Sequence, residues 1–178
     1  DPKLKKLKGD SLYGAMIRRL VKNGGKVAGL IWYQGEGDAN ANASRVYTAK
    51  MKELIAALRR DAKLPAMPVA IVQISRHVIN PTSAACDWNS VQDQERRLPK
   101  VIKNLATVPA IDLTLDDGIH ISGRGHIVLG ARLADAMQWL INGRKAALPP
   151  IELDSISVSK SVRDSRKSES SSQTSPVS

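Results

Sequence analysis

The sequence predicts an α/β protein in which helices cover both faces of a parallel sheet. Apolar runs at residues 27–33, 68–74 and 108–113 alternate with segments of helical periodicity. Such alternation is typical of strand–helix–strand units, whose strands run parallel. Polar clusters at 34–38 and 116–120 each follow a predicted strand. Because the carboxyl ends of parallel strands share one edge of the sheet, we expect the two clusters to form a ligand site there.

The first half of the chain predicts helix, strand and helix. Asp10 or Ser11 can cap a first helix, which Asn-Gly-Gly at residues 23–25 should end. Residues 27–33 (VAGLIWY) lack helical spacing, so we expect a strand buried on both faces. Ser44 is the expected cap of a second helix. Its predicted apolar face comprises Tyr47, Met51, Leu54, Ile55 and Leu58.

The second half predicts two more strands and two more helices. Residues 68–74 (PVAIVQI) are short and β-branched and favour a buried strand, which a loop at 75–86 should follow. Asp87 is expected to cap a helix that stops at Pro99, and residues 108–113 to form a third strand. Asn142 and Gly143 should end a final helix. Its predicted apolar face comprises Ile127, Leu129, Gly130, Leu133, Ala134, Met137, Leu140 and Ile141.

Composition excludes several classes of protein. The formal net charge is +10, and residues 1–31 hold eight Lys or Arg against two Asp. No aromatic residue interleaves the lysines of residues 3–8, so we do not expect nucleic-acid binding. No apolar run is long enough to cross a bilayer, so we expect no membrane embedding. A single cysteine excludes an internal disulfide, and no His and carboxylate spacing predicts a metal site or a cofactor.

Three segments differ in character along the chain. Residues 1–9 form a basic lead-in, residues 10–147 a globular domain, and residues 148–178 a Ser-rich segment that we expect to be a disordered tail or a linker. Ser fills 11 of the 24 positions from 155 to 178. Three strands make a thin parallel sheet, and the chain begins with Asp1 instead of Met. We therefore expect a processed chain or a piece of a longer protein, in which at least one further strand completes the domain on its amino-terminal side.

The polar clusters carry groups suited to ester hydrolysis. Asp117 and His120 have the D-x-x-H spacing in which a carboxylate can orient an imidazole that acts as a general base. Gln34 offers a side-chain N–H, and Gly35 leaves the backbone open to an oxyanion. Glu36 is expected to be partly buried and to support the loop of the nucleophile. The same D-x-x-H spacing also arises when a surface histidine lies beside a helix-capping aspartate.

Four separated strings resemble one enzyme family. LIWYQGEGDAN, SLYGAMI, WNSVQDQERRLP and DDGIHISGRGHIVLGARLA are similar to motifs of the sialate O-acetylesterase and carbohydrate esterase family 6 group of the SGNH hydrolases, over roughly residues 10–140. The resemblance implies a flavodoxin-like three-layer α/β/α fold and hydrolysis of acetyl esters on sugars by a Ser-His-Asp mechanism. It makes His120 the base, Asp117 its partner, and Gln34 with Gly35 part of the oxyanion site. Analogy with secreted relatives suggests a secreted or periplasmic location.

The sequence departs from that family at two places. Gly37 replaces a small hydroxyl residue of the signature, which loosens the turn. The family's nucleophilic serine follows a strand that precedes the WYQGE strand, and this chain has no such strand. Gly9-Asp10-Ser11-Leu12 has the letters of the nucleophile motif, but lysines precede it and capping explains Ser11. We expect the serine to lie outside this chain; the alternatives are a non-catalytic carbohydrate-binding or scaffold protein and, less favoured, a basic nucleic-acid-binding module.

Overall fold

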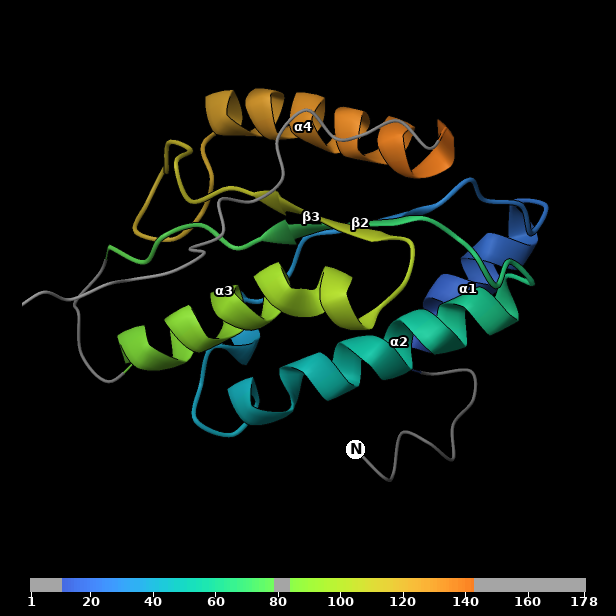
Figure 1. Ribbon diagram of the computed structural model, residues 1–178, viewed down its shortest axis with the longest axis horizontal. Coiled ribbons are helices and arrows are strands. Elements are labelled where there is room, and N and C mark those ends of the chain that lie inside the picture. The colour runs from blue at the N-terminus through green and yellow to red at the C-terminus, as the bar shows by residue number, and fades with distance from the viewer. Residues whose placement is uncertain (1–10, 79–83, 143–178) are drawn as a thin grey trace, which may run out of the picture.

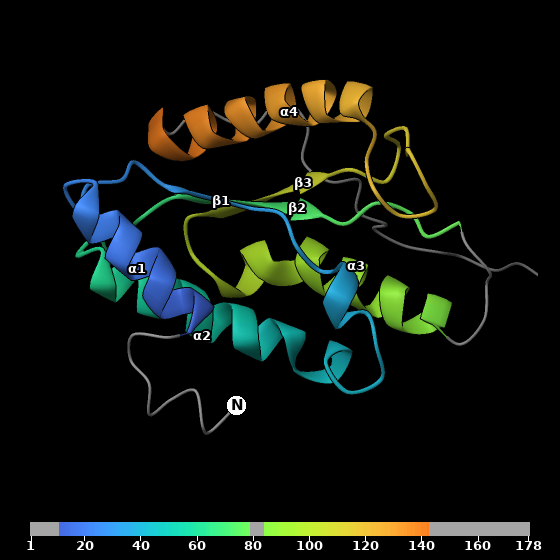
Figure 2. The ribbon, with the colours of Figure 1, turned by 180° about the vertical axis from the view of Figure 1, so that it is seen from behind.

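The computed structural model describes residues 11–78 and 84–142, with only the backbone of residues 84–86. It has three layers, as predicted (Figures 1 and 2). Helix α4 (Gly123–Asn142) covers one face of the sheet, whereas α2 (Tyr47–Asp61) and α3 (Ala84–Val101) cover the other. Helix α1 (Leu12–Lys22) lies alongside α2. The predicted basic lead-in and Ser-rich segment lie outside the described residues.

The sheet has three parallel strands in the order β1-β2-β3. They are β1 (Leu30–Trp32), β2 (Val69–Gln73) and β3 (Leu105–Pro109). Strand β2 is central, and its first four residues are buried, because it has a strand on each side and helices above and below. The prediction of an α/β fold with a parallel sheet is confirmed.

Strand β1 is less buried than the sequence predicts. The side chain of Ile31 is 55% exposed, so the expectation of a strand buried on both faces is wrong. Leu30 and Trp32 pack against the core on the α2 and α3 side. Ile31 points to the opposite face, where α4 covers β2 and β3. Within the described residues β1 pairs only with β2, so its other edge has no strand partner.

Helix α1 begins and ends at the expected residues. The Ser11 hydroxyl accepts a hydrogen bond from the Gly14 N–H at 3.0 Å, which confirms Ser11 as the cap. The chain then leaves the helix through Gly24 and Gly25, whose φ angles are +88° and +69°. Glycine adopts these left-handed angles without the steric cost that a Cβ would impose.

Two predicted helix caps are wrong for one shared reason. Ser44 begins a short 3₁₀ turn, η3 (Ser44–Val46), and α2 starts at Tyr47 without a side-chain cap. Asp87 lies within the first turn of α3, which begins at Ala84, four residues earlier than a cap at Asp87 predicts. The Ser44 hydroxyl donates to Asp87 Oδ1 at 3.2 Å, so each side chain joins one segment to the other instead of capping its own helix.

Helix α3 also continues past its predicted end. Pro99 has no backbone N–H and cannot donate to the carbonyl of Glu95 four residues earlier. The hydroxyl of Thr107 on β3 donates to that carbonyl at 2.7 Å. Because a side chain of the sheet satisfies the carbonyl that the proline leaves free, the helix runs on to Val101.

The third strand and the last helix differ from the prediction in detail. Strand β3 begins at Leu105 instead of residue 108. It pairs with β2 from Leu105, opposite Val69, to Pro109, opposite Gln73. Helix α4 ends at Asn142 as expected. It buries Leu129, Leu133 and Ala136 but exposes four residues of its predicted apolar face, because the narrow sheet covers one stripe only. These four are Ile127, Gly130, Ala134 and Ile141.

Candidate active site at the carboxyl edge of the sheet

The turn after β1 brings Gly35 into close contact with a buried carboxyl group. A Cβ on Gly35 would lie 2.6 Å from Glu95 Oε1 and 2.8 Å from Ile74 Cγ2. Real Cβ atoms do not approach neighbours so closely, so the turn requires glycine here. The Gly35 N–H donates to Glu36 Oε2 at 3.0 Å. This amide, a predicted oxyanion donor, therefore already faces a negatively charged oxygen.

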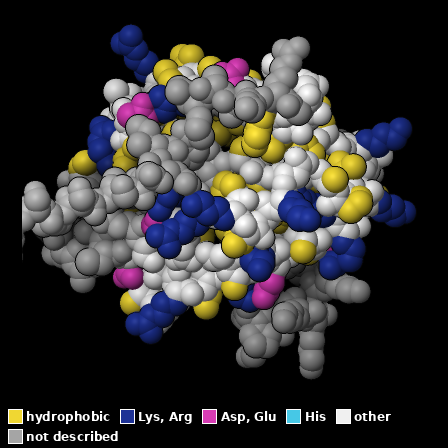
Figure 3. Space-filling view, viewed as in Figure 1, with side chains coloured by type: hydrophobic (Ala, Val, Ile, Leu, Met, Phe, Trp, Pro, Cys, Tyr) yellow, Lys and Arg dark blue, Asp and Glu magenta, His cyan; other side chains and the backbone are white. Residues whose placement is uncertain are grey.

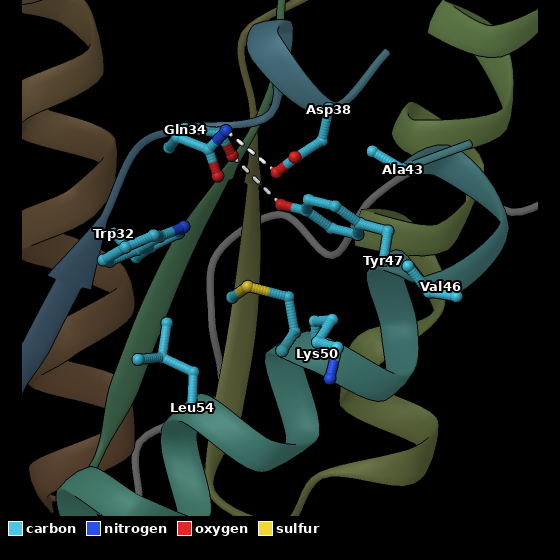
Figure 4. Close-up of a pocket in the computed structure, with 9 residues that line it drawn as sticks. Trp32, Gln34, Asp38, Ala43, Val46, Tyr47, Lys50 and Leu54 are labelled. Carbon is cyan, nitrogen blue, oxygen red and sulfur yellow. Dashed lines mark hydrogen bonds between the residues drawn. The ribbon is translucent and has the colours of Figure 1, made fainter. Parts of the chain in front are cut away.

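The side chain of Gln34 points into a pocket on the α2 side of β1. The pocket has a volume of about 250 Å³, and apolar groups of Trp32, Met51 and Leu54 line much of it (Figure 4). Gln34 Nε2 donates to Asp38 Oδ2 at 3.0 Å. That bond uses one of the two amide hydrogens. The buried indole nitrogen of Trp32 has no hydrogen-bond partner in the part of the chain that the structure describes.

Asp117 and His120 form a hydrogen-bonded pair. The His120 Nδ1 atom lies 2.6 Å from Asp117 Oδ2, while Asp117 Oδ1 accepts the backbone N–H groups of Ile119 and His120. The hydrogen bond from the imidazole is the main cause that lowers the pKa of Asp117 to about 2. The same bond raises the pKa of His120. The carboxylate thus fixes the imidazole through Nδ1 and leaves Nε2 for another partner.

Tyr33 lies between the two polar clusters. Its hydroxyl is near the Glu36 carboxylate and the backbone amide of Ile121, next to His120. Burial and the Glu36 charge raise the pKa of Tyr33, and the same charge contributes to the raised pKa of His120. The structure therefore brings Gly35 and Glu36 toward the His120 loop. The Gln34 side chain lies instead on the α2 side, because successive side chains alternate between the two faces of an extended strand.

Two functional candidates were missed by the sequence analysis. Glu95 is fully buried beneath the Gly35 turn, and its carboxyl group accepts the Ile74 N–H at 2.8 Å. The Tyr47 hydroxyl lies 2.9 Å from Glu95 Oε1 and 3.0 Å from the Gln34 carbonyl oxygen. A signal for Glu95 was present in the sequence. It shares a helical face with Trp88, Val91 and Leu98, and a carboxylate at such a position indicates a buried acid.

No serine of the described residues is bonded to His120. Each of the five has its hydroxyl in a hydrogen bond to another group. They are Ser11, Ser44, Ser75, Ser90 and Ser122. Ser11 lies away from the carboxyl edge of the sheet. Tyr13, two residues further along, donates to Asp61 at the end of α2, and the chain enters β2 after that end.

Residues 11–78 and 84–142 contain neither a cluster of metal ligands nor a membrane-spanning helix. No group of three or more His, Cys, Asp or Glu side chains in these ranges could hold a metal ion. No helix in the same ranges is both long and apolar enough to cross a membrane.

Comparison with known proteins identifies the family. Residues 3–139 match the profile of a family described as carbohydrate esterase, sialic acid-specific acetylesterase. A probable carbohydrate esterase of Arabidopsis thaliana is 31% identical over 134 residues, which are 72% of this chain and 48% of that protein. This chain thus spans about half the length of that curated relative.

Two solved structures share the fold of this chain. The crystal structure of an Arabidopsis thaliana protein superposes with a TM-score of 0.63 at 30% identity, covering 73% of this chain and 53% of that one. A carbohydrate acetylesterase from Xanthomonas citri, 23% identical, has the same fold, with a TM-score of 0.64 over 76% of this chain and 32% of its own. The protein therefore belongs to the family of carbohydrate esterases described as sialic acid-specific acetylesterases.

Proposed function

We propose that this chain supplies the His-Asp part of a carbohydrate O-acetylesterase active site. The observation that carries the proposal is the Asp117–His120 pair, whose Nδ1 and Oδ2 atoms lie 2.6 Å apart on a loop near Tyr33. An imidazole oriented through Nδ1 by a carboxylate is the arrangement that activates a serine hydroxyl. Family membership supports an acetylated sugar as the substrate.

The reaction follows the two steps of serine esterases. His120 Nε2 takes the proton of a serine hydroxyl while the serine oxygen bonds to the acetyl carbonyl carbon. The sugar oxygen leaves with that proton, and an acetyl-enzyme remains. Water then loses a proton to His120 and attacks the same carbon, which releases acetate and frees the serine. Asp117 stabilises the imidazolium that forms in each step.

The turn after β1 is suited to hold the developing negative charge. The Gly35 N–H is the proposed oxyanion donor, and the second amide hydrogen of Gln34 joins it when that side chain turns out of the pocket on the α2 side. The contact between Gly35 N and Glu36 Oε2 supports this role, because a carboxylate oxygen makes the hydrogen bond that an oxyanion would make. Substrate binding then requires the Glu36 carboxylate to move from the Gly35 amide.

The nucleophilic serine is proposed to lie outside the described residues. All five serine hydroxyls of the described residues already bond other groups. The open edge of β1, next to the Gly35 turn, is where a further parallel strand could end close to His120.

Two other functions receive less support. A non-catalytic carbohydrate-binding or scaffold protein could keep this fold, but it would have no need of the Asp117–His120 pair. A nucleic-acid-binding module requires a continuous basic surface. On the face seen in Figure 3, the described Lys and Arg side chains are dispersed among other residues.

The test is acetate release by the intact protein from acetylated xylan, O-acetylated sialic acid and an aryl acetate. We expect His120→Ala to lower kcat by about a million-fold, because the serine loses its base. Activity of the unmodified enzyme should rise with pH as His120 loses its proton. The matched control is His77→Ala, since His77 packs against Trp88 outside the pair and should leave kcat nearly unchanged. Normal turnover by His120→Ala would refute the proposal.

A further inference from the structure

Three groups from separate parts of the chain form a continuous hydrogen-bonded series beneath the Gly35 turn. They are the Glu95 carboxyl group on α3, the Tyr47 hydroxyl at the start of α2, and the Gln34 carbonyl after β1. Tyr47 Oη lies 2.9 Å from Glu95 Oε1 and 3.0 Å from the Gln34 oxygen. The esterase mechanism proposed above uses neither Glu95 nor Tyr47.

Counting hydrogens determines the protonation state in which the series is complete. A tyrosine hydroxyl carries one hydrogen and can donate to one of its two neighbours. The Gln34 carbonyl can only accept. If Tyr47 donates to Gln34, then Glu95 must donate to Tyr47, and only the protonated acid can do so. The second oxygen of Glu95 then accepts the Ile74 N–H at 2.8 Å, so every polar group is satisfied.

We infer that Glu95, as a neutral carboxylic acid, is a positioning residue that holds the Gln34–Gly35 peptide in place through Tyr47. The Gly35 N–H belongs to this peptide, so the series orients a proposed oxyanion donor. This inference deepens the esterase function and rests on it for its catalytic consequence.

The surroundings of Glu95 favour the neutral form. Burial is the main cause that raises its pKa to about 8. The carboxylates of Glu36 and Asp38, in the turn after β1, raise it further. The Ile74 amide on β2 and the Tyr47 hydroxyl on α2 act in the opposite direction. Tyr33, also after β1, is the other titratable group that interacts with Glu95, and its own pKa is raised above the usual value.

Ionisation of Glu95 should loosen the turn. A Glu95 carboxylate would draw the Tyr47 hydrogen to itself, and the Gln34 carbonyl would lose its donor. A Cβ on Gly35 would lie 2.6 Å from Glu95 Oε1, so the change occurs next to the peptide that carries the oxyanion donor. Above a pH of about 8 we therefore expect a less ordered Gly35 amide.

The first experiment needs no catalytic activity. The backbone amide of Gly35 is followed by NMR in the 178-residue chain as the pH is raised. We expect its shift to titrate with a midpoint of about 8. In Glu95→Gln this titration should disappear, because a carboxamide donates to Tyr47 and accepts from Ile74 without ionising. Tyr47→Phe should remove most of it by breaking the series. The inference would be overturned if the Gly35 amide shift still titrated in Glu95→Gln, or if it did not titrate in the unmodified chain.

The second experiment measures kcat/KM against pH in the intact protein. We expect a fall in kcat/KM above a pH of about 8, and we expect Glu95→Gln to keep its activity there. An unchanged alkaline fall in Glu95→Gln would also overturn the inference. If no variant hydrolyses any acetate while the Gly35 amide titrates as described, then the esterase proposal fails and the positioning by Glu95 stands. The two proposals are therefore tested separately.

Discussion

At the scale of single residues, Gly35 carries the tightest steric constraint in the candidate site. Its Cα leaves no room for a methyl group, because Glu95 Oε1 and Ile74 Cγ2 lie within 2.8 Å of the position that a Cβ would take. Both neighbours belong to fully buried side chains, which cannot move aside easily. The fold thus constrains residue 35 before any catalytic demand is considered.

Gly35→Ala should destabilise the protein. We expect a loss of about 1–3 kcal/mol in the free energy of unfolding, since overpacking in a tight site displaces its neighbours. Urea unfolding measures this change. Gly37→Ala is the matched control two residues away, because a Cβ there meets nothing within 4 Å. Equal stability of the two variants would contradict the prediction, because it would mean that the neighbours of residue 35 make room for a methyl group without a loss of stability.

At the scale of secondary-structure elements, α3 depends on a side chain from the sheet. Pro99 deprives the Glu95 carbonyl of its helical partner, and Thr107 Oγ1 replaces that partner at 2.7 Å. The bond joins α3 to β3, and its acceptor is the backbone carbonyl of Glu95, the residue whose carboxyl group lies beneath the candidate site. A helix that contains a proline is therefore continuous because of its tertiary contact.

Thr107→Val should cost about 1–3 kcal/mol of stability, because it leaves a buried carbonyl without a donor. The cost should shrink when Pro99→Ala is also present, since an alanine N–H can donate to the Glu95 carbonyl. A double-mutant cycle measured by chemical unfolding gives this coupling. Additive effects of the two substitutions would contradict the account of why α3 continues past Pro99.

At the scale of the whole molecule, buried and exposed acids respond differently to pH. Asp117 is exposed, and its lowered pKa comes from hydrogen bonds within one loop. Glu95 lies between α2, α3 and the sheet, and burial raises its pKa to about 8. Its ordinary value in an unfolded chain is about 4.3. The folded protein therefore binds a proton at Glu95 over a pH range in which the unfolded chain has released it.

Stability should consequently fall as the pH rises from about 4.3 to about 8. The contribution of Glu95 is fully present below the unfolded pKa and is lost as the pH approaches the folded value. Its slope should not exceed about 1.4 kcal/mol per pH unit. Chemical unfolding of the unmodified chain and of Glu95→Gln isolates this contribution, because other groups affect both proteins alike. A difference between the two that does not vary with pH would refute a buried neutral Glu95.

Much of the molecule followed from the sequence because local patterns determine it. The alternation of apolar runs and helical periodicity predicts a parallel α/β fold, since each segment must bury its own apolar side. The cap at Ser11 acts within four residues, so it is visible without a partner from elsewhere. The Asp117–His120 contact likewise spans three residues of one loop, and the D-x-x-H spacing is enough to predict a paired geometry.

Other features were decided only by contacts between distant segments. Ser44 and Asp87 bond each other instead of capping helices. The Thr107 hydroxyl supplies the hydrogen bond that Pro99 cannot make, so α3 continues past Pro99. Tyr47 and Glu95 are 48 positions apart in the chain, yet they meet beneath Gly35. Local propensity sets which segments become helices or strands, but buried polar groups must find partners wherever the fold places them. The sequence by itself therefore determined the layers and the His-Asp pair, whereas the tertiary structure decided the caps, the register of β3 and the buried acid that supports the site.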